Sequence, residues 1–359
     1  MAAAPPTDLF LDLTPERVLA AVEAGGLRCR PLCYPLNSFE NRVYEVELED
    51  RTRRVAKFYR PGRWSREQIL EEHTFLGECD ADEIPVCPAL SFPGGGTLRE
   101  VDGIHYALFE RKAGRAPDEL DDAGAERLGM LVGRLHAVGA RRDAPSRVRI
   151  DGTSFVRADL AYLEEHAVVP PAIWPRYAAA ASSIADLYDA RAVGVATQRV
   201  HGDLHLGNVL LREGALRLLD FDDMAIAPPV QDLWLALPGR DAATLRQRDL
   251  FLDGYERFRI FDHASLALIE PLRGLRLVHY AAWLARRWHD PIFPKSWPHF
   301  GTEEYWLRET EGLEEVLQEA AGRVGRGSST GGSADGEAGG GAAAEELTNK
   351  DYFWDWEPS

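Results

Sequence analysis

Three polar side chains follow one another at fixed intervals in the middle of the chain. Asp203 and Asn208 lie in HGDLHLGNVL, and Asp220 follows in LLDFDDM. Two strand-like runs, NVLL and LRLLDF, are joined by the turn-like REGA, and a hairpin returns its ends to one side. We therefore expect Asn208 and Asp220 to face one cavity. A carboxylate and a carboxamide suit Mg²⁺ held mainly by substrate phosphates, and Asp203 can take a proton from a hydroxyl. The set indicates phosphoryl transfer.

The surrounding patterns predict an α+β protein. Residues 28–112 read as a small lobe in which the strand-like runs 42–48, 53–59 and 104–111 surround a helix at 66–78. Residues 113–324 read as a larger, mainly helical lobe that contains the hairpin. A helical extension, 1–27, precedes them. The Gly-, Ala- and Ser-rich stretch that opens residues 325–359 predicts a disordered acidic tail, whose aromatic end, DYFWDWEPS, either docks or stays unstructured.

Composition limits the classes of partner. The formal net charge of −17 disfavours nucleic acids and anionic membranes. Cys29, Cys33, Cys79 and Cys87 lack zinc-finger spacing and are expected to be buried free thiols. The chain shows neither a signal peptide nor an apolar run of about 20 residues. We expect a soluble, cytoplasmic monomer.

The order and spacing of the central motif resemble those of the kinase-like phosphotransferases. H-x-D-x-x-x-x-N is followed by D-F-x, and HGD and DFD replace the H-R-D and D-F-G of protein kinases. These departures look like the aminoglycoside phosphotransferase and choline kinase branch. The resemblance implies a bilobal, protein-kinase-like fold with ATP and Mg²⁺ as cofactors. It implies Asp203 as catalytic base, Asn208 as a metal ligand, and Asp220 as a catalytic residue and second metal ligand. It leaves the roles of Asp222 and Asp223 open.

The same resemblance assigns roles in the small lobe. Lys57, in the apolar run VAKFY, would pair with the ATP phosphates, and an edge-strand lysine is the plain alternative. Glu72 is preferred to Glu71 as its partner because its spacing to Phe75 and Leu76 fits the helix face better.

Two connecting segments would complete the nucleotide site. The loop in PLNSFENRVYEV stands where kinases carry a Gly-rich flap but contains no glycine. Ser38 and nearby backbone N–H groups would then contact the phosphates, and an ordinary turn at Asn37 and Ser38 is the alternative. FERKAG (109–114) is placed to be the hinge whose backbone would contact adenine.

Two residues of the helical lobe have structural interpretations. His136, in GRLHAVG, is expected to be a core histidine with its polar atoms satisfied. Asp232, in PPVQDLWLAL, either braces the catalytic loop, as is common in this superfamily, or is a plain acid near a helix N-terminus.

Longer stretches look like the bacterial stress response kinase A family. These include LNSFENRVYEVE, VAKFYRPGRWSREQILEEHTFL and the segment 283–306, and the similarity covers about residues 7–320. The resemblance implies phosphorylation of Ser and Thr on protein substrates, in a stress response. It also makes Ser38 an ATP-contacting serine and a candidate for modification.

Two other functions stay open. A small-molecule kinase could use the same site on an aminoglycoside, choline or homoserine. The basic run 273–289, with Arg273, Arg276, Arg286 and Arg287, favours an anionic or peptide acceptor instead, unless these arginines only pair with surface acids. A non-catalytic pseudokinase that binds a partner is disfavoured because the lysine, the two aspartates and the asparagine are all present.

Overall fold

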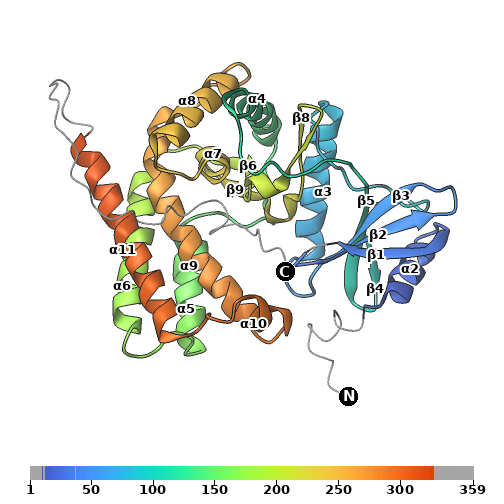
Figure 1. Cartoon of the computed structure of the whole chain (residues 1–359), viewed down its shortest axis with the longest axis horizontal. Coiled ribbons are helices and arrows are strands. Elements are labelled where there is room, and N and C mark those ends of the chain that lie inside the picture. Colours follow the sequence, from blue (N-terminus) through green and yellow to red (C-terminus); the bar gives the residue numbers. More distant parts are fainter. Residues whose placement is uncertain (1–9, 11–12, 37, 327–359) are drawn as a thin grey trace.

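A small sheet-containing lobe and a larger helical lobe make up the chain (Figure 1). The computed structural model describes residues 10, 13–36 and 38–326. The small lobe contains α2 (Pro15–Ala24), β1 (Cys29–Leu36), β2 (Arg42–Leu48), β3 (Arg53–Phe58), α3 (Arg66–Ala81), β4 (Arg99–Val101) and β5 (Ile104–Glu110). Its five strands pair antiparallel in the order β1-β2-β3-β5-β4.

Alternation along β3 gives the sheet two different faces. Ala56 and Phe58 point into a core that includes Val18 and Val22 of α2. Val55 and Lys57 point the opposite way and line a cavity between the lobes. Because side chains alternate along a strand, one six-residue strand both anchors the lobe and presents the lysine.

Helices form most of the larger lobe. They are α4 (Asp122–Gly139), α5 (Ala158–Glu165), α6 (Trp174–Arg191), α7 (Val230–Ala236), α8 (Ala242–Glu256), α9 (Ile269–Arg287), α10 (Ile292–Ser296) and α11 (Glu303–Arg326). Between α6 and α7 lie the hairpin β7 (Val209–Arg212) and β8 (Ala215–Leu218), and the paired strands β6 (Gln198–Val200) and β9 (Ala225–Ala227). A π-helical turn (Thr153–Arg157) and short 3₁₀ helices (Leu206–Asn208, Phe221–Asp223 and His263–Leu268) connect these elements.

The expected α+β, bilobal architecture is confirmed, with three differences of detail. Sequence analysis missed β1, whose Pro31 and Pro35 are typical of an edge strand, where an absent N–H costs little. It also missed β4, β6 and β9, which have only three residues each. Helix α11 continues past the expected boundary at residue 324. The rest of the predicted tail, 327–359, lies outside the described residues, and so does Asn37.

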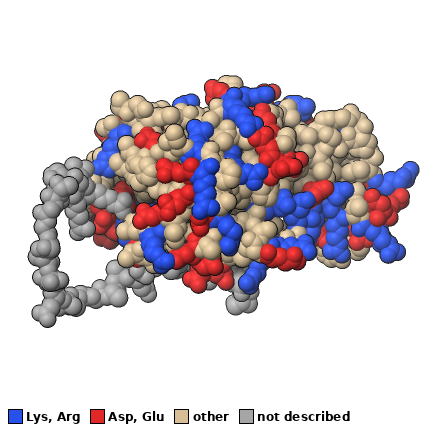
Figure 2. All heavy atoms as spheres, turned by 90° about the horizontal axis from the view of Figure 1, so that it is seen from above, with Lys and Arg blue, Asp and Glu red and all other residues tan. Residues whose placement is uncertain are grey.

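Three features relate to the composition of the chain: its surface charge, its cysteines and the hydrophobicity of its helices. Acidic and basic side chains are interspersed over the face seen in Figure 2, so the net negative charge forms no single patch there. All four cysteines are free, as expected, but only Cys79 is buried, whereas Cys29, Cys33 and Cys87 are half-buried. Among the described residues, none of the helices combines the length and apolar composition that a bilayer crossing requires.

Glycines allow α4 and α8 to approach closely. A Cβ atom added at Gly129 would lie 1.9 Å from the Phe251 carbonyl oxygen, and one at Gly133 would lie 2.6 Å from that of Tyr255. From the other helix, a Cβ at Gly254 would lie 2.1 Å from the Glu126 oxygen. This contact fixes α4, whose later turns carry His136.

Gly129→Ala should therefore destabilise the protein, because the two backbones must separate. We expect a loss of about 1–3 kcal/mol or more in the free energy of unfolding, measured by urea denaturation. Gly77→Ala is the matched control: Gly77 is helical, and its added Cβ would meet nothing within 4 Å. That change should be neutral or stabilise by up to about 1 kcal/mol. Equal effects of the two substitutions would contradict the steric explanation.

Candidate active site

A cavity of about 480 Å³ lies between the two lobes. Its apolar walls include Val43 and Val55 from the sheet and Leu210 and Leu218 from the hairpin. Ser38, Lys57, Glu72, Asn208 and Asp220 also line it, as do residues 109–112 and Gly114 of the predicted hinge. The structure thus brings five predicted site residues to one cavity.

Lys57 is the buried cation of this cavity. Its Nζ lies 2.9 Å from Asp220 Oδ1, 3.0 Å from Asp222 Oδ1 and 3.8 Å from Glu72 Oε1. Burial alone would lower the pKa of Lys57, but the three carboxylates raise it well above its usual value. Glu72 faces the lysine, whereas Glu71 accepts the backbone N–H of Ser146. The pKa of Glu72 rises to about 7, mainly through burial.

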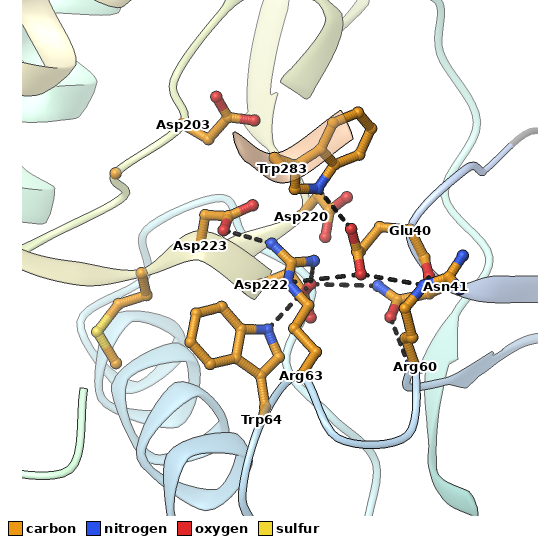
Figure 3. Close-up of polar contacts among 12 residues, drawn as sticks. Glu40, Asn41, Arg60, Arg63, Trp64, Asp203, Asp220, Asp222, Asp223 and Trp283 are labelled. Carbon is orange, nitrogen blue, oxygen red and sulfur yellow. Dashed lines mark hydrogen bonds and ion pairs between the residues drawn. The ribbon is translucent and has the colours of Figure 1, made fainter. Parts of the chain in front are cut away.

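Asp222 joins the two lobes, a role that the sequence left open. Its Oδ2 lies 2.5 Å from an Arg63 nitrogen and accepts longer bonds, both 3.3 Å, from Asn41 Nδ2 and Trp64 Nε1 (Figure 3). Although burial opposes ionisation, Lys57 and Arg63 hold its pKa well below the usual range. The same Arg63 also binds Asp223 Oδ1 at 2.5 Å. Burial raises the pKa of Asp223 despite that contact.

Asp220 and Asn208 fit a divalent cation that also binds phosphate. Asp220 adopts a left-handed backbone conformation (φ 53°, ψ 70°), an uncommon state for a non-glycine residue that re-aims the chain directly after the hairpin. Asn208 donates Nδ2–H to the Asp203 carbonyl oxygen at 2.9 Å, which leaves its carboxamide oxygen available to a metal. Two hard-oxygen side chains at a roomy cavity match the preference of Mg²⁺ for few protein ligands and several from phosphate or water. Among the described residues, no three His, Cys, Asp or Glu side chains form a metal site of their own.

Asp203 lies on the helical-lobe side of this site. Its Oδ1 forms an ion pair with Arg276 of α9 at 2.7 Å, and its Oδ2 lies 3.5 Å from His205 Nε2. Burial would raise the pKa of Asp203, but Arg276 and His205 hold it well below the usual range. The side chain is therefore an anion that can accept a hydrogen bond from a hydroxyl.

Asp232 braces the loop that carries Asp203. Its fully buried carboxylate accepts the backbone N–H groups of His201 at 2.8 Å and Gly202 at 2.9 Å. His136 Nε2 lies 2.9 Å from the same group, and His136 Nδ1 lies 3.1 Å from the Tyr255 hydroxyl. Of the two roles considered for Asp232, the structure shows the brace. His136 is the satisfied core histidine that the sequence indicated.

The arginines of α9 correct one interpretation. Arg273 pairs with Glu270 at 3.3 Å, Arg286 with Asp159 at 2.5 Å and Arg287 with Glu40 at 2.6 Å, and Arg276 pairs with Asp203. Glu270 and Asp159 are each 1% exposed, so these acids belong to the interior rather than to the surface. The basic run is neutralised within the fold and gives no argument for an anionic acceptor.

Sequence reasoning missed Arg63, Glu40 and Arg276 as members of the site. Arg63 lies 159 positions from Asp222, and Glu40 lies 243 positions from its partner Trp283. Motif spacing cannot identify pairs so distant. A local signal was available in RPGRW, the segment that contains Arg63 and Trp64 and follows the strand of Lys57. Its proline and glycine are typical of a turn, here between β3 and α3.

Comparison with known proteins identifies the family. The model of the phosphotransferase enzyme family matches residues 34–269. The chain belongs to that family. It is 41% identical over 304 residues to stress response kinase A of Salmonella paratyphi A, covering 84% of this chain and 92% of the relative. The "Serine/threonine protein kinase RdoA" of Salmonella typhimurium gives the same identity and coverage.

The phosphotransferase family and the stress response kinase A relatives, both indicated by the sequence resemblance, identify the chain as a kinase. A solved structure, amicoumacin kinase hAmiN in complex with AMP-PNP, Ca²⁺ and Ami, shares the fold with a TM-score of 0.69 at 19% identity. The match covers 87% of this chain and 96% of that one.

Asp232→Asn should disrupt the braced loop, because one acceptor oxygen becomes an N–H donor that faces other donors. We expect a loss of about 3 kcal/mol or more in the free energy of unfolding, by thermal or urea denaturation. Asp241→Asn is the control, since Asp241 caps α8 by accepting Thr244 N–H at 2.9 Å, and Asn caps about as well. An Asp232→Asn protein as stable as the control would rule out the brace.

Proposed function

We propose that this chain is an ATP- and Mg²⁺-dependent kinase that transfers the γ-phosphate to Ser or Thr hydroxyls of protein substrates. The observation that carries the proposal is the convergence of Lys57, Asn208 and Asp220 on one cavity beside Asp203. Phosphoryl transfer requires a cation, two hard-oxygen metal ligands and a carboxylate that accepts a hydrogen bond from the attacking hydroxyl. The printed name of the Salmonella typhimurium relative supports a Ser/Thr protein acceptor.

Each residue has a defined task in this mechanism. Lys57 binds the ATP phosphates, and residues 109–114 contact the adenine through their backbone. Asn208 and Asp220 would hold Mg²⁺, which supplies charge neutralisation when bound. Asp203 accepts a hydrogen bond from the incoming hydroxyl and orients it for direct in-line attack, while Arg276 fixes the carboxylate.

Glu72 and Ser38 assist the nucleotide. Glu72 orients Lys57 from α3. Ser38, in the loop between β1 and β2, contacts the phosphates, with neighbouring backbone N–H groups beside it. Phosphorylation of Ser38 would add negative charge where the ATP phosphates bind, so it would weaken nucleotide binding.

A small-molecule acceptor is the second candidate. The observation that favours this candidate is the pairing of the α9 arginines with acids inside the fold, which removes the argument against a cationic acceptor. Labelled ATP should be offered side by side to a Ser/Thr peptide library and to a panel of aminoalcohols. Preferential labelling of peptides supports the protein kinase, and labelling of aminoalcohols alone supports the alternative.

Asp203→Asn should separate catalysis from nucleotide binding. The carboxamide is a weaker acceptor and cannot take the proton, so we expect phosphoryl transfer to fall by about 10²- to 10⁴-fold. The Mg²⁺–ATP-induced thermal shift should persist because Asp203 does not line the nucleotide cavity. Exposed Asp253 on α8 provides the control, Asp253→Asn, which should leave both measurements unchanged. Undiminished transfer by Asp203→Asn would exclude Asp203 as the base.

A further inference from the structure

Three successive residues after Ser38 each contact the helical lobe. The Phe39 ring lies 5.3 Å from that of Trp297, edge to face, just after α10. Glu40 accepts the indole N–H of Trp283 on α9 at 2.7 Å. Asn41 donates to Asp222 at 3.3 Å. A loop that lies over a nucleotide cavity is here attached at consecutive positions to the opposite lobe.

Glu40 is the charged centre of this attachment. Its Oε2 also forms an ion pair with Arg287 Nε at 2.6 Å. Burial would raise the pKa of Glu40, yet Arg63 and Arg287 lower it below its usual value, so the buried side chain is a carboxylate. A buried carboxylate that accepts hydrogen bonds from fixed donors is held in place, because leaving it uncompensated is costly.

Arg60 holds the backbone of the same loop. It donates through Nε to the Glu40 carbonyl oxygen at 2.9 Å and through a terminal nitrogen to that of Phe39 at 3.0 Å. The terminal nitrogen also lies 3.1 Å from Asp290 Oδ2, and Asp290 is 1% exposed. Asp290 lies between α9 and α10, so the arginine that shapes the loop is itself anchored on the helical lobe.

We propose that Trp283, Arg287, Asp290 and Trp297, here named the α9–α10 clamp, are positioning residues that hold the Ser38 loop ready to bind nucleotide phosphates. The clamp is a second junction between the lobes. In Figure 1 the chain crosses from β5 to α4 past α3, whereas α10 lies lower in the view, at the bottom of the helical lobe. This inference rests on the proposed function, in which nucleotide occupies the cavity between those junctions.

The clamp would act through preorganisation. Without fixed contacts, the loop would have to be ordered when nucleotide binds, at a cost in conformational entropy. The clamp orders the loop beforehand, so nucleotide affinity should depend on side chains of the helical lobe that do not line the cavity. Weakening it should raise the Kd and KM for ATP more than it lowers kcat.

Two conservative substitutions test the clamp in the full chain. Trp283→Phe removes the indole N–H and keeps an aromatic ring, and Arg287→Lys keeps the charge but loses the guanidinium geometry. Arg286→Lys is the matched control, because Arg286 is adjacent on α9 but pairs with Asp159 at 2.5 Å instead of Glu40. We expect each clamp variant to raise the Kd for Mg²⁺–AMP-PNP by about 3- to 30-fold, as for loss of a charge-assisted hydrogen bond. The control should stay within about twofold.

Hydrogen exchange provides a readout that needs no nucleotide. Amides of residues 38–42 should exchange faster in both clamp variants than in the wild type and the control. Unchanged loop exchange, or a lower melting temperature with unchanged Kd, would show a merely structural role and overturn the proposal. If the wild type bound no nucleotide, the proposed function would fail and the clamp with it. Equal nucleotide affinity of wild type and variants would overturn the clamp alone.

Discussion

The buried ammonium of Lys57 and the carboxylates around it constrain the rest of the structure. The lysine and Glu72 come from the small lobe, whereas Asp220 and Asp222 come from the segment after the hairpin. A buried charge without a partner costs several kcal/mol, so neither lobe can close the cavity in this form alone. Neutralising these charges and assembling the site are therefore one event. A nucleotide phosphate can take the place of a carboxylate beside Lys57, and its cation can take the place of the lysine beside Asp220, because the pair brings both signs of charge to the same site.

A second set of buried contacts fixes the loop that carries Asp203 independently of that charge balance. Asp232 accepts two N–H groups of the loop and contacts His136. His136 belongs to α4, and glycines allow α4 to pack closely against α8. The loop is thus attached to a pair of helices whose backbones lie in close contact. Asp220 is positioned differently, by a left-handed residue at the end of a hairpin. The proposed base and the proposed metal ligand therefore depend on separate structural supports, and damage to one need not displace the other.

The sequence predicted what short-range spacing determines. Asn208 and Asp220 flank one hairpin and Asp203 lies five residues before Asn208, so the proximity of the three followed from local geometry. Lys57 was visible as a charge in an apolar strand, and Glu72 followed from the helix face. The contacts of Arg63, Glu40 and Arg276 could not be predicted, because their partners lie on elements far along the chain. The spacing of residues within a motif does not indicate which distant elements pack together. Likewise, the arginines of α9 were visible as charge, but their effect depended on buried acids from other elements. Strand β1 was hidden by prolines that only its edge position makes tolerable.

Helix α9 links the two halves of the proposed chemistry. Arg276 holds the carboxylate of Asp203, while Trp283 and Arg287 hold Glu40 beside the Ser38 loop. Seven and eleven residues are about two and three helical turns, so these side chains lie near one face of the helix. At a rise of about 1.5 Å per residue, the helix sets a separation of roughly 10–16 Å along its axis. A rigid helix thereby fixes the distance between the proposed base and the loop proposed to contact the donor phosphates. In the proposed mechanism, positioning of both substrates then depends on one element of the helical lobe, which suits a reaction governed by alignment and charge.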